Sequence, residues 1–262
     1  MSLSAYDHVQ IARDKDRLKG LGLVQALCDE VIEMHGDRHF KDDPSMFCGC
    51  AILGQHSVMI IAQVKGTNTA DNVHKNFGMN QPEGFRKAIR AVQLANKLNI
   101  PIVSIVDTPG AYPGLGAEER GQHSAIAHCL YAFASAEVPI ITIVLSEGGS
   151  GGALALSIAN HIIMFEHAIY SILSPEGFAS ILYKDASKSK EVAELMGLTS
   201  YDLKAKGIVD EIVDESKSMN AAIKDTKIKV LKQLELLKTM SKAELIAHKD
   251  KKFRKMGSDY GH

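Results

Sequence analysis

The chain has 262 residues, of which 45% are hydrophobic, and its formal net charge at pH 7 is −1. These values fit one large α/β domain and give no overall field that would attract nucleic acid or a membrane surface. No apolar run reaches the roughly 20 residues that span a bilayer, and the N-terminus lacks a secretion-signal pattern. The four cysteines form no CxxC pair, so we expect reduced thiols, no metal site and a cytoplasmic protein.

The first third of the chain predicts a helical segment, a hairpin and a long polar loop. Residues 4–35 have a helical pattern, with basic residues that we expect on a solvated face: Arg13, Lys15, Arg17 and Lys19. Two β-type runs, 46–53 and 57–64, flank a three-residue connection with glycine, which suggests a hairpin. The polar stretch 65–81 is long for a connection in a compact domain, so it is a candidate functional loop.

The middle of the chain alternates helices with short apolar strands. The predicted elements are a helix from Pro82, a strand at 100–106, a helix at 118–136, a strand at 138–145 and a helix at 153–159. Strands of this kind are typical of a parallel sheet that is covered on both faces. The loops 107–114 and 147–152 follow two such strands, so we expect both at the carboxyl edge of the sheet, where ligands bind.

The last third of the chain predicts short strands followed by helices. These are strands at 161–165 and 169–173, a helix capped by Ser174 with Pro175 behind it, short helices at 187–196 and 200–206, and a pair of amphipathic helices from 216 to 254. We interpret residues 1–262 as one domain with a helical N-terminal segment, 1–36, and a Lys-rich helical C-terminal extension, 216–262.

Residues 145–156 read Leu-Ser-Glu-Gly-Gly-Ser-Gly-Gly-Ala-Leu-Ala-Leu and are the most informative part of the chain. Glycines at a strand-to-helix turn let the backbone approach a ligand closely, because no Cβ intervenes. The first N–H groups of a helix also lack intrahelical partners. Together these features predict a turn that stabilises an oxyanion.

The same segment allows a rival interpretation, a serine hydrolase. Gly148-Gly-Ser-Gly-Gly152 matches the G-x-S-x-G pattern of a nucleophile elbow around Ser150. Such an enzyme also needs an acid and a later histidine, for which Asp210 and His248 are candidates, besides His161, His167 and His262. Because His248 falls in the Lys-rich tail, we favour Ser150 as a small residue needed for close packing.

Other charged residues have both a functional and a plain interpretation. Asp107-Thr-Pro-Gly110 resembles a GTPase motif, but the chain has no P-loop sequence. Glu118, Glu119 and Arg120 form either an acid/base group or the charged first turn of a helix. Five cations either hold phosphates of a nucleotide-bearing substrate or face solvent: Lys65, Lys75, Arg86, Lys87 and Arg90.

Taken in order, the motifs resemble the α subunits of bacterial acetyl-CoA carboxylase carboxyltransferase. The resemblance covers most of residues 5–256 and rests on long runs, among them Asn76-Phe-Gly-Met, Pro82-Glu-Gly-Phe-Arg-Lys87, Asp107-Thr-Pro-Gly-Ala-Tyr-Pro-Gly-Leu-Gly-Ala-Glu-Glu-Arg-Gly-Gln122, Glu147-Gly-Gly-Ser-Gly-Gly-Ala-Leu-Ala155 and Ser174-Pro-Glu-Gly177. It implies the crotonase fold of repeated ββα units. It also implies an active site that is shared between α and β subunits, in an α2β2 assembly whose β subunit carries the zinc.

The implied reaction moves a carboxyl group from carboxybiotin, supplied by the biotin carboxyl carrier protein, to acetyl-CoA, which gives malonyl-CoA for fatty acid synthesis. Biotin carboxylase is the further implied partner, and no cofactor is bound covalently. Backbone N–H groups of Gly151 and Gly152 are the implied oxyanion donors. We expect further substrate contacts at Gly148, Gly149, Gly110 and Ala111.

One departure from the family pattern concerns Ala62-Gln63-Val64, where the family usually has Gly-His-Gln. We expect this change to affect a ligand contact near residues 62–64 and to leave the glycine turn untouched. The alternatives to a carboxyltransferase half-site are an acyl-CoA-binding or regulatory relative and the serine hydrolase that uses Ser150.

Overall fold

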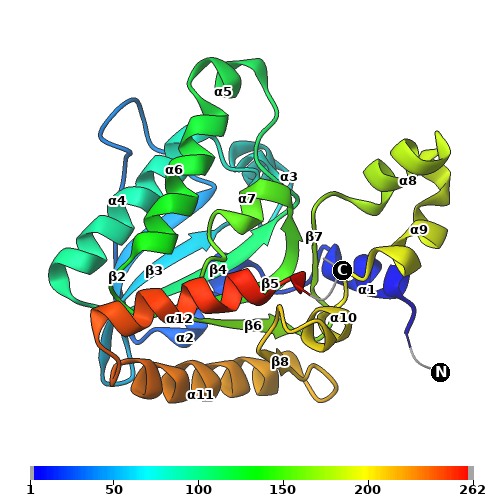
Figure 1. Cartoon of the computed structure of the whole chain (residues 1–262). Helices are drawn as coiled ribbons and strands as arrows, with labels where there is room; N and C mark the ends of the chain where they lie inside the picture. Colours follow the sequence, from blue (N-terminus) through cyan, green and yellow to red (C-terminus); the bar gives the residue numbers. More distant parts are fainter. Residues whose placement is uncertain (1–2, 259–262) are drawn as a thin grey trace.

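An eight-stranded mixed sheet forms the centre of the protein, whose computed structural model describes residues 3–258 (Figure 1). Its strands are β1 (Glu30–Glu33), β2 (Met46–Leu53), β3 (His56–Gln63), β4 (Ile102–Thr108), β5 (Ile140–Gly149), β6 (His161–Phe165), β7 (Ile169–Ser171) and β8 (Glu211–Val213). The order across the sheet is β1-β2-β3-β4-β5-β6-β8, and β7 pairs with the end of β5.

Strand directions divide the sheet into two parts. β1, β2 and β3 pair in antiparallel fashion, and β2 and β3 form the predicted hairpin. From β3 to β8 the neighbouring strands run parallel, as do β5 and β7. Every residue of β4 and β5 is buried, which explains why these strands read as unalternating apolar runs. Their carboxyl ends therefore meet at one edge of the sheet.

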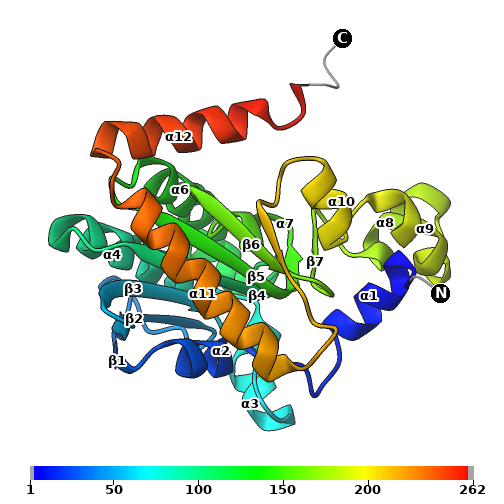
Figure 2. The same cartoon turned by 90° about the horizontal axis from the view of Figure 1, so that it is seen from below.

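Helices cover both faces of the sheet (Figure 2). They are α1 (Ala5–Ala12), α2 (Gly20–Leu27), α3 (Thr69–His74), α4 (Pro82–Leu98), α5 (Leu115–Glu119), α6 (Gln122–Ser135), α7 (Ser150–Leu154), α8 (Pro175–Tyr183), α9 (Ser189–Met196), α10 (Ser200–Ala205), α11 (Met219–Leu237) and α12 (Lys242–Lys255), with 3-10 turns η1 (Asn76–Gly78) and η2 (Ala186–Lys188). α4 and α6 pack together on one face, whereas α2 and α11 pack together on the other. No helix in residues 3–258 combines the length and apolar character needed to cross a bilayer.

Helices α1, α8 and α9 form a lobe beside the main body (Figures 1 and 2). A small buried cluster, separate from the main core, joins α1 of the lobe to β7 and to the segment after α9: Val9, Ala12, Ile169 and Leu198. Ser174 caps α8 as the sequence predicts, because its side chain accepts a bond from the Gly177 N–H group and Pro175 follows it. The lobe carries part of the wall of the candidate site described below.

The prediction of a continuous helical segment at residues 4–35 is wrong. α1 ends at Ala12, α2 begins at Gly20, and residues 30–33 form the edge strand β1 beside β2. All four residues of β1 are exposed, so no buried face marks it in the sequence. The basic residues at 13–19 lie in the linker rather than on a helical face, and Arg17 is buried, donating to the Leu145 carbonyl oxygen at 2.9 Å.

Three further elements differ from the prediction. The helix predicted at 118–136 is divided by Gly121, whose φ of 82° is left-handed. The polar stretch 65–81 contains α3 and η1. The helix predicted at 153–159 spans 150–154 instead. After residue 154 the chain forms tighter turns, because backbone N–H groups there bond to carbonyl oxygens three residues back; the Leu156 N–H group, for example, donates to the Ala153 oxygen at 3.1 Å.

The C-terminal helix α12 is fixed to the body by a buried lysine. Lys249 is 2% exposed, and its ammonium donates to the carbonyl oxygens of Phe133 and Ala136, each at 2.8 Å. These carbonyls lie at the end of α6, where the last acceptors lack the partner four residues on that a continuing helix would supply, so the cation compensates them. Burial lowers the pKa of Lys249 to about 8.

This pKa predicts how stability changes with pH. An unfolded lysine has a pKa of about 10.4, so between pH 8 and pH 10 the unfolded chain binds more protons at this position. Stability therefore rises with pH there, by up to about 1.4 kcal/mol per pH unit. We expect Lys249→Met to lose that rise in urea unfolding measured across this range, and the exposed Lys251→Met to retain it. Equal pH slopes in the two variants would refute the prediction.

Candidate active site

The glycine segment begins inside a strand and ends in a short helix. Gly148 and Gly149 belong to β5, where they pair with Tyr170 and Ser171 of β7. Ser150 has a φ of 55° and is exposed, and it opens the five-residue helix α7. A helix this short adds little dipole field, so any anion binding here depends on individual N–H groups at its start.

The two glycine-bearing loops are packed backbone against backbone. A Cβ on Gly149 would lie 2.0 Å from the Pro109 carbonyl oxygen, and one on Gly152 would lie 2.6 Å from the Ala111 nitrogen. Glycine is therefore required at both positions for the loops after β4 and β5 to meet. Gly151 differs, because its Cβ would meet only the Ile126 side chain, at 3.6 Å.

A single buried glutamine connects these loops to the neighbouring strand. Gln63 ends β3, and its Nε2 donates to the Gly152 carbonyl oxygen at 2.8 Å and to Asn80 Oδ1 at 2.9 Å. Its Oε1 accepts from the Asp107 N–H group at 3.3 Å. Asn80 in turn accepts from the Tyr112 N–H group through its carbonyl oxygen, at 3.0 Å. The expectation that the change at residues 62–64 leaves the glycine turn untouched is therefore wrong.

Charged side chains at the same sheet edge form a continuous series. Lys65 follows β3, and its Nζ lies 2.8 Å from Asp107 Oδ1 and 3.6 Å from Glu147 Oε2. Arg13 pairs with Glu147 at 2.8 Å and with Glu176 of α8 at 2.9 Å. Asp107 is fully buried and also accepts a bond from the Ser146 hydroxyl. The series joins the ends of β4 and β5 to the lobe.

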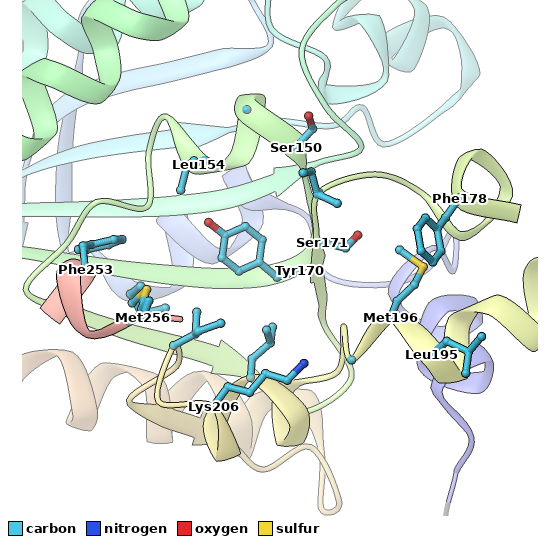
Figure 3. Close-up of a pocket in the computed structure, with 16 residues that line it drawn as sticks. Ser150, Leu154, Tyr170, Ser171, Phe178, Leu195, Met196, Lys206, Phe253 and Met256 are labelled. Carbon is cyan, nitrogen blue, oxygen red and sulfur yellow. The ribbon is translucent and has the colours of Figure 1, made fainter. Parts of the chain in front are cut away.

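A large cavity, the apolar cavity, opens beside α7 (Figure 3). Its volume is about 740 Å3, and Ser150, Gly151 and Leu154 line it on the α7 side. Tyr170 and Phe253 project into it from the main body, and Phe178, Leu195 and Met196 line it from the lobe. No histidine or carboxylate of the described chain is among its lining residues. The cavity therefore offers backbone N–H groups and apolar surface, with Lys206 as its charged lining residue within the described chain (Figure 3) and no histidine–carboxylate pair.

The predicted site residues are brought together, but they differ in accessibility. Gly151 is half-buried and faces the apolar cavity, whereas Gly152, Gly148 and Gly149 are buried. Gly110 and Ala111 are half-buried in the loop that packs on Gly152. Gly151 is thus the glycine of this set with direct access to the cavity.

The cations that the sequence offers as phosphate ligands are paired inside the protein. The pairs are Lys65 with Asp107, Lys75 with Asp71 at 2.9 Å, Arg86 with Asp37 at 2.8 Å, Lys87 with Asp42 at 2.8 Å, and Arg90 with the His35 carbonyl oxygen at 2.9 Å. These cations do not lie on a solvated helix face either; Lys87, for example, is only 1% exposed. Glu118 and Glu119 are exposed, and Arg120 pairs with Glu83 at 2.7 Å.

The hydrolase residues are not assembled around Ser150. Its positive φ and exposed hydroxyl resemble a nucleophile elbow. Asp210, however, pairs with Lys252 and lies 3.8 Å from His161, and His248 is exposed on α12. His167 contacts His8 instead, with the two Nδ1 atoms 3.3 Å apart, and His262 is outside the described residues. None of the candidate residues within 3–258 is therefore placed to act as a general base for Ser150.

Two structural findings bear on metal and thiol chemistry. Within residues 3–258, no group of three or more His, Cys, Asp or Glu side chains is arranged to hold a metal ion. Cys28, Cys48, Cys50 and Cys129 are free thiols. Burial raises the pKa of Cys28 to about 11 and that of Cys48 to about 12, so both stay protonated and unreactive near neutral pH.

Comparisons with known proteins agree on one family. The family model described as "Acetyl co-enzyme A carboxylase carboxyltransferase-like" matches residues 1–257. An acetyl-coenzyme A carboxylase carboxyl transferase subunit alpha from Campylobacter lari is 44% identical over 262 residues, covering 98% of this chain and 84% of that protein. The subunit of the same name from Staphylococcus aureus is 44% identical over 264 residues, covering 98% and 83%.

Solved structures with lower sequence identity show the fold. A transcarboxylase 12S chain matches with a TM-score of 0.71 and 24% identity, over 88% of this chain and 44% of that one. A chain of a Pseudomonas malonate decarboxylase hetero-tetramer matches with a TM-score of 0.70 and 18% identity, over 88% and 92%. These likenesses confirm the predicted crotonase-like fold. The family match over residues 1–257 and the 44% identical relatives show that this chain belongs to the family of acetyl-CoA carboxylase carboxyltransferase alpha subunits.

Proposed function

We propose that this chain acts as the alpha half of a biotin-dependent carboxyltransferase. It would transfer a carboxyl group from carboxybiotin, carried on the biotin carboxyl carrier protein, to acetyl-CoA to form malonyl-CoA. The observation that carries the proposal is family membership along residues 1–257. The packed loops that bear glycines at the ends of β4 and β5 support it, because they present backbone donors beside an apolar cavity.

The residues of the apolar cavity fit the chemistry of a carboxybiotin donor. Carboxybiotin supplies the carboxyl group, and its transfer places negative charge on the ureido oxygen. The Gly151 N–H group at the start of α7 is available to hydrogen-bond that oxygen. Tyr170, Leu154 and Phe253 give the cavity an apolar lining, which excludes water and strengthens such a bond.

Exposed apolar residues at the rim of the apolar cavity support the proposal that a partner subunit binds there. Two aliphatic residues at its rim are largely exposed, Ile172 at 77% and Leu195 at 66%. Exposed apolar residues around a cavity are typical of a surface that another protein covers. We propose that a zinc-bearing beta-type subunit covers this rim in an α2β2 assembly, with biotin carboxylase as the further partner of the complex. The setting we propose is cytoplasmic.

The alternative function is an acyl-CoA-binding or regulatory relative without transfer activity. The two proposals differ in one measurement, malonyl-CoA-dependent carboxylation of biotin by the chain purified with its beta-type partner. Formation of carboxybiotin supports the transferase. Its absence in a well-assembled complex supports the alternative.

Gly151 provides the sharpest test of the proposed oxyanion donor. Gly151→Val adds a side chain without contact to backbone at short range and pushes the ureido oxygen away from the N–H group. We expect turnover to fall by about 100-fold, with a much smaller effect on acetyl-CoA binding. Gly152→Val is a poorer probe, because it collides with the Ala111 backbone.

The matched control is the neighbouring Ser150→Ala, which removes a hydroxyl and keeps the helix start. We expect it to retain most transfer activity. A folded, partner-bound Gly151→Val complex with near-normal turnover would remove Gly151 from the site. Covalent labelling of Ser150 by a fluorophosphonate would restore the hydrolase interpretation.

Gln63 is expected to position the donor rather than touch substrate. Gln63→Leu leaves the Gly152 carbonyl and the Asp107 N–H group buried without partners, which costs about 1–3 kcal/mol for each group. Urea unfolding should show lower stability, and turnover should fall more than acetyl-CoA binding weakens. Gln63→His, which restores a donor of the family type, should recover much of the turnover. If Gln63→Leu and Gln63→His lose turnover equally, the hypothesis that a side-chain hydrogen-bond donor at residue 63 positions the glycine turn is wrong.

The proposed interface can be tested at its rim. Ile172→Glu and Leu195→Glu each place a charge on the surface that the beta-type subunit would cover, so we expect both to reduce co-purification by tenfold or more, roughly the effect of 1.4 kcal/mol. Ile228→Glu is the matched control, because Ile228 is 65% exposed on α11 and outside the cavity. Undiminished co-purification of both rim variants would place the partner elsewhere.

A further inference from the structure

Two histidines, the histidine pair, meet where the lobe contacts the main body. His8 belongs to α1 of the lobe, and His167 lies in the turn between β6 and β7. Their Nδ1 atoms are 3.3 Å apart, and the ring centroids are 5.1 Å apart, with the ring planes tilted by 49°. His8 is 5% exposed and His167 is half-buried. The proposed carboxyl transfer uses neither residue.

The contact between the two rings depends on how many protons they carry. A hydrogen bond between two Nδ1 atoms needs one N–H group and one lone pair. The neutral pair provides both, when one ring carries its proton on Nδ1 and the other on Nε2. One added proton is also tolerated, because the ring that stays neutral still offers its lone pair. A second added proton puts N–H groups on both Nδ1 atoms and two positive charges in contact, so it breaks the bond.

Titratable and charged groups surround the pair on every element that packs around it. They are Asp7 on α1, Glu166 in the same turn as His167, Lys190 and Glu194 on α9, Tyr201 on α10, Asp214 and Glu215 after β8, and Arg17 in the linker after α1. The Tyr201 ring meets the His8 ring edge-on, with the centroids 6.3 Å apart.

The two carboxylates on the main-body side of the pair are already engaged. Glu166 accepts from the Tyr201 hydroxyl at 2.6 Å and from the Glu215 N–H group at 2.9 Å. Glu215 forms an ion pair with Arg17 at 2.8 Å. Within residues 3–258, neither ring of the histidine pair forms an ion pair with a carboxylate. A second positive charge on the pair therefore has no dedicated counter-charge.

Burial agrees with this geometry. It lowers the pKa of His8, and the His167 charge lowers that pKa further, although Glu166 and Asp7 oppose both effects. Because the rings are in contact, their protons bind in two steps that belong to the pair. The docked arrangement resists the second step.

We propose that the histidine pair is a pH-sensitive switch, which keeps α1 docked on the main body with one added proton or none and releases it with two. In the released state the rings bind protons as unfolded histidines do, with a pKa of about 6.5. Below about pH 6.5 the released state therefore holds more protons than the docked state. The equilibrium constant for release rises as the pH falls, by up to about tenfold per pH unit. Above that pH both states are neutral, and docking has its full strength.

Release of α1 has a consequence for the apolar cavity. α1 packs on α9, and Leu195 and Met196 of α9 line that cavity. The cavity wall on the lobe side therefore loses part of its support when the histidine pair is doubly protonated. The inference does not depend on the proposed carboxyl transfer, since release is measured without turnover.

The test is amide hydrogen exchange of the full chain between about pH 7.5 and about pH 5, corrected for the intrinsic exchange rate. We expect the opening constant of the α1 amides to rise at least about tenfold toward the lower pH, while the buried strand β4 stays protected. The double variant His8→Gln with His167→Gln keeps hydrogen-bonding side chains that do not titrate, so its opening constant should change by about twofold or less. His123→Gln is the matched control, because the His123 side chain is 87% exposed and distant from the pair in sequence. It should behave as the parent does. EDTA is present throughout, so that no metal ion bridges the two Nδ1 atoms.

NMR titration of the histidine rings in the unmodified chain gives a second measurement, with signals assigned from His8→Gln and His167→Gln. We expect the pair to titrate in two steps, the second below about pH 6.5. Independent titration of both rings near that value overturns the proposal, as does α1 protection that is equal at the two ends of the pH range. A rise in opening that the double variant retains also overturns it. Parallel loss of protection in β4 does the same, because the chain then unfolds as a whole. Thermal melting of each variant checks that it is folded.

Discussion

The side-chain amide of Gln63 is the contact on which the candidate site depends. It is fully buried and both donates and accepts, so one neutral group joins the end of β3 to the end of β4 and to α7. A charged group at this depth would need a partner of its own to offset the loss of water. The amide avoids that cost and still satisfies the backbone groups of Gly152 and Asp107.

Neutral hydrogen bonds and ion pairs hold different segments at this edge of the sheet. Amide contacts among Gln63, Asn80 and the backbone hold the glycine-bearing loops, while the ion pairs that run from Asp107 through Lys65 and Glu147 to Arg13 hold the lobe. The apolar cavity itself has no lining carboxylate or histidine within the described chain, and its charged lining residue there is Lys206. In the proposed function, this cavity would stabilise developing charge with fixed backbone dipoles.

Sequence patterns predict what depends on local periodicity and miss what depends on contacts distant in sequence. The buried strands β4 and β5, the hairpin and the Ser174 cap follow from apolar runs and turn residues. β1 has no buried face, so its pattern is indistinguishable from that of an exposed helix. Gln63 is a lone polar residue at the end of an apolar strand, a signal that is visible in the sequence, but its partners lie 17 to 89 residues away. The packing reason for Gly152 is likewise invisible without the Ala111 loop beside it.

The small buried cluster that joins the lobe to β7 has a consequence for motion. It contains four residues, Val9, Ala12, Ile169 and Leu198, far fewer than the main core, so we expect the lobe to separate from the sheet at a lower free energy than the sheet needs to unfold. Leu195 and Met196 belong to the lobe, whereas Leu154 and Tyr170 rest on the sheet and α7. The apolar cavity thus has a stiff floor and a compliant wall, and its width can fluctuate while the glycine turn keeps its shape.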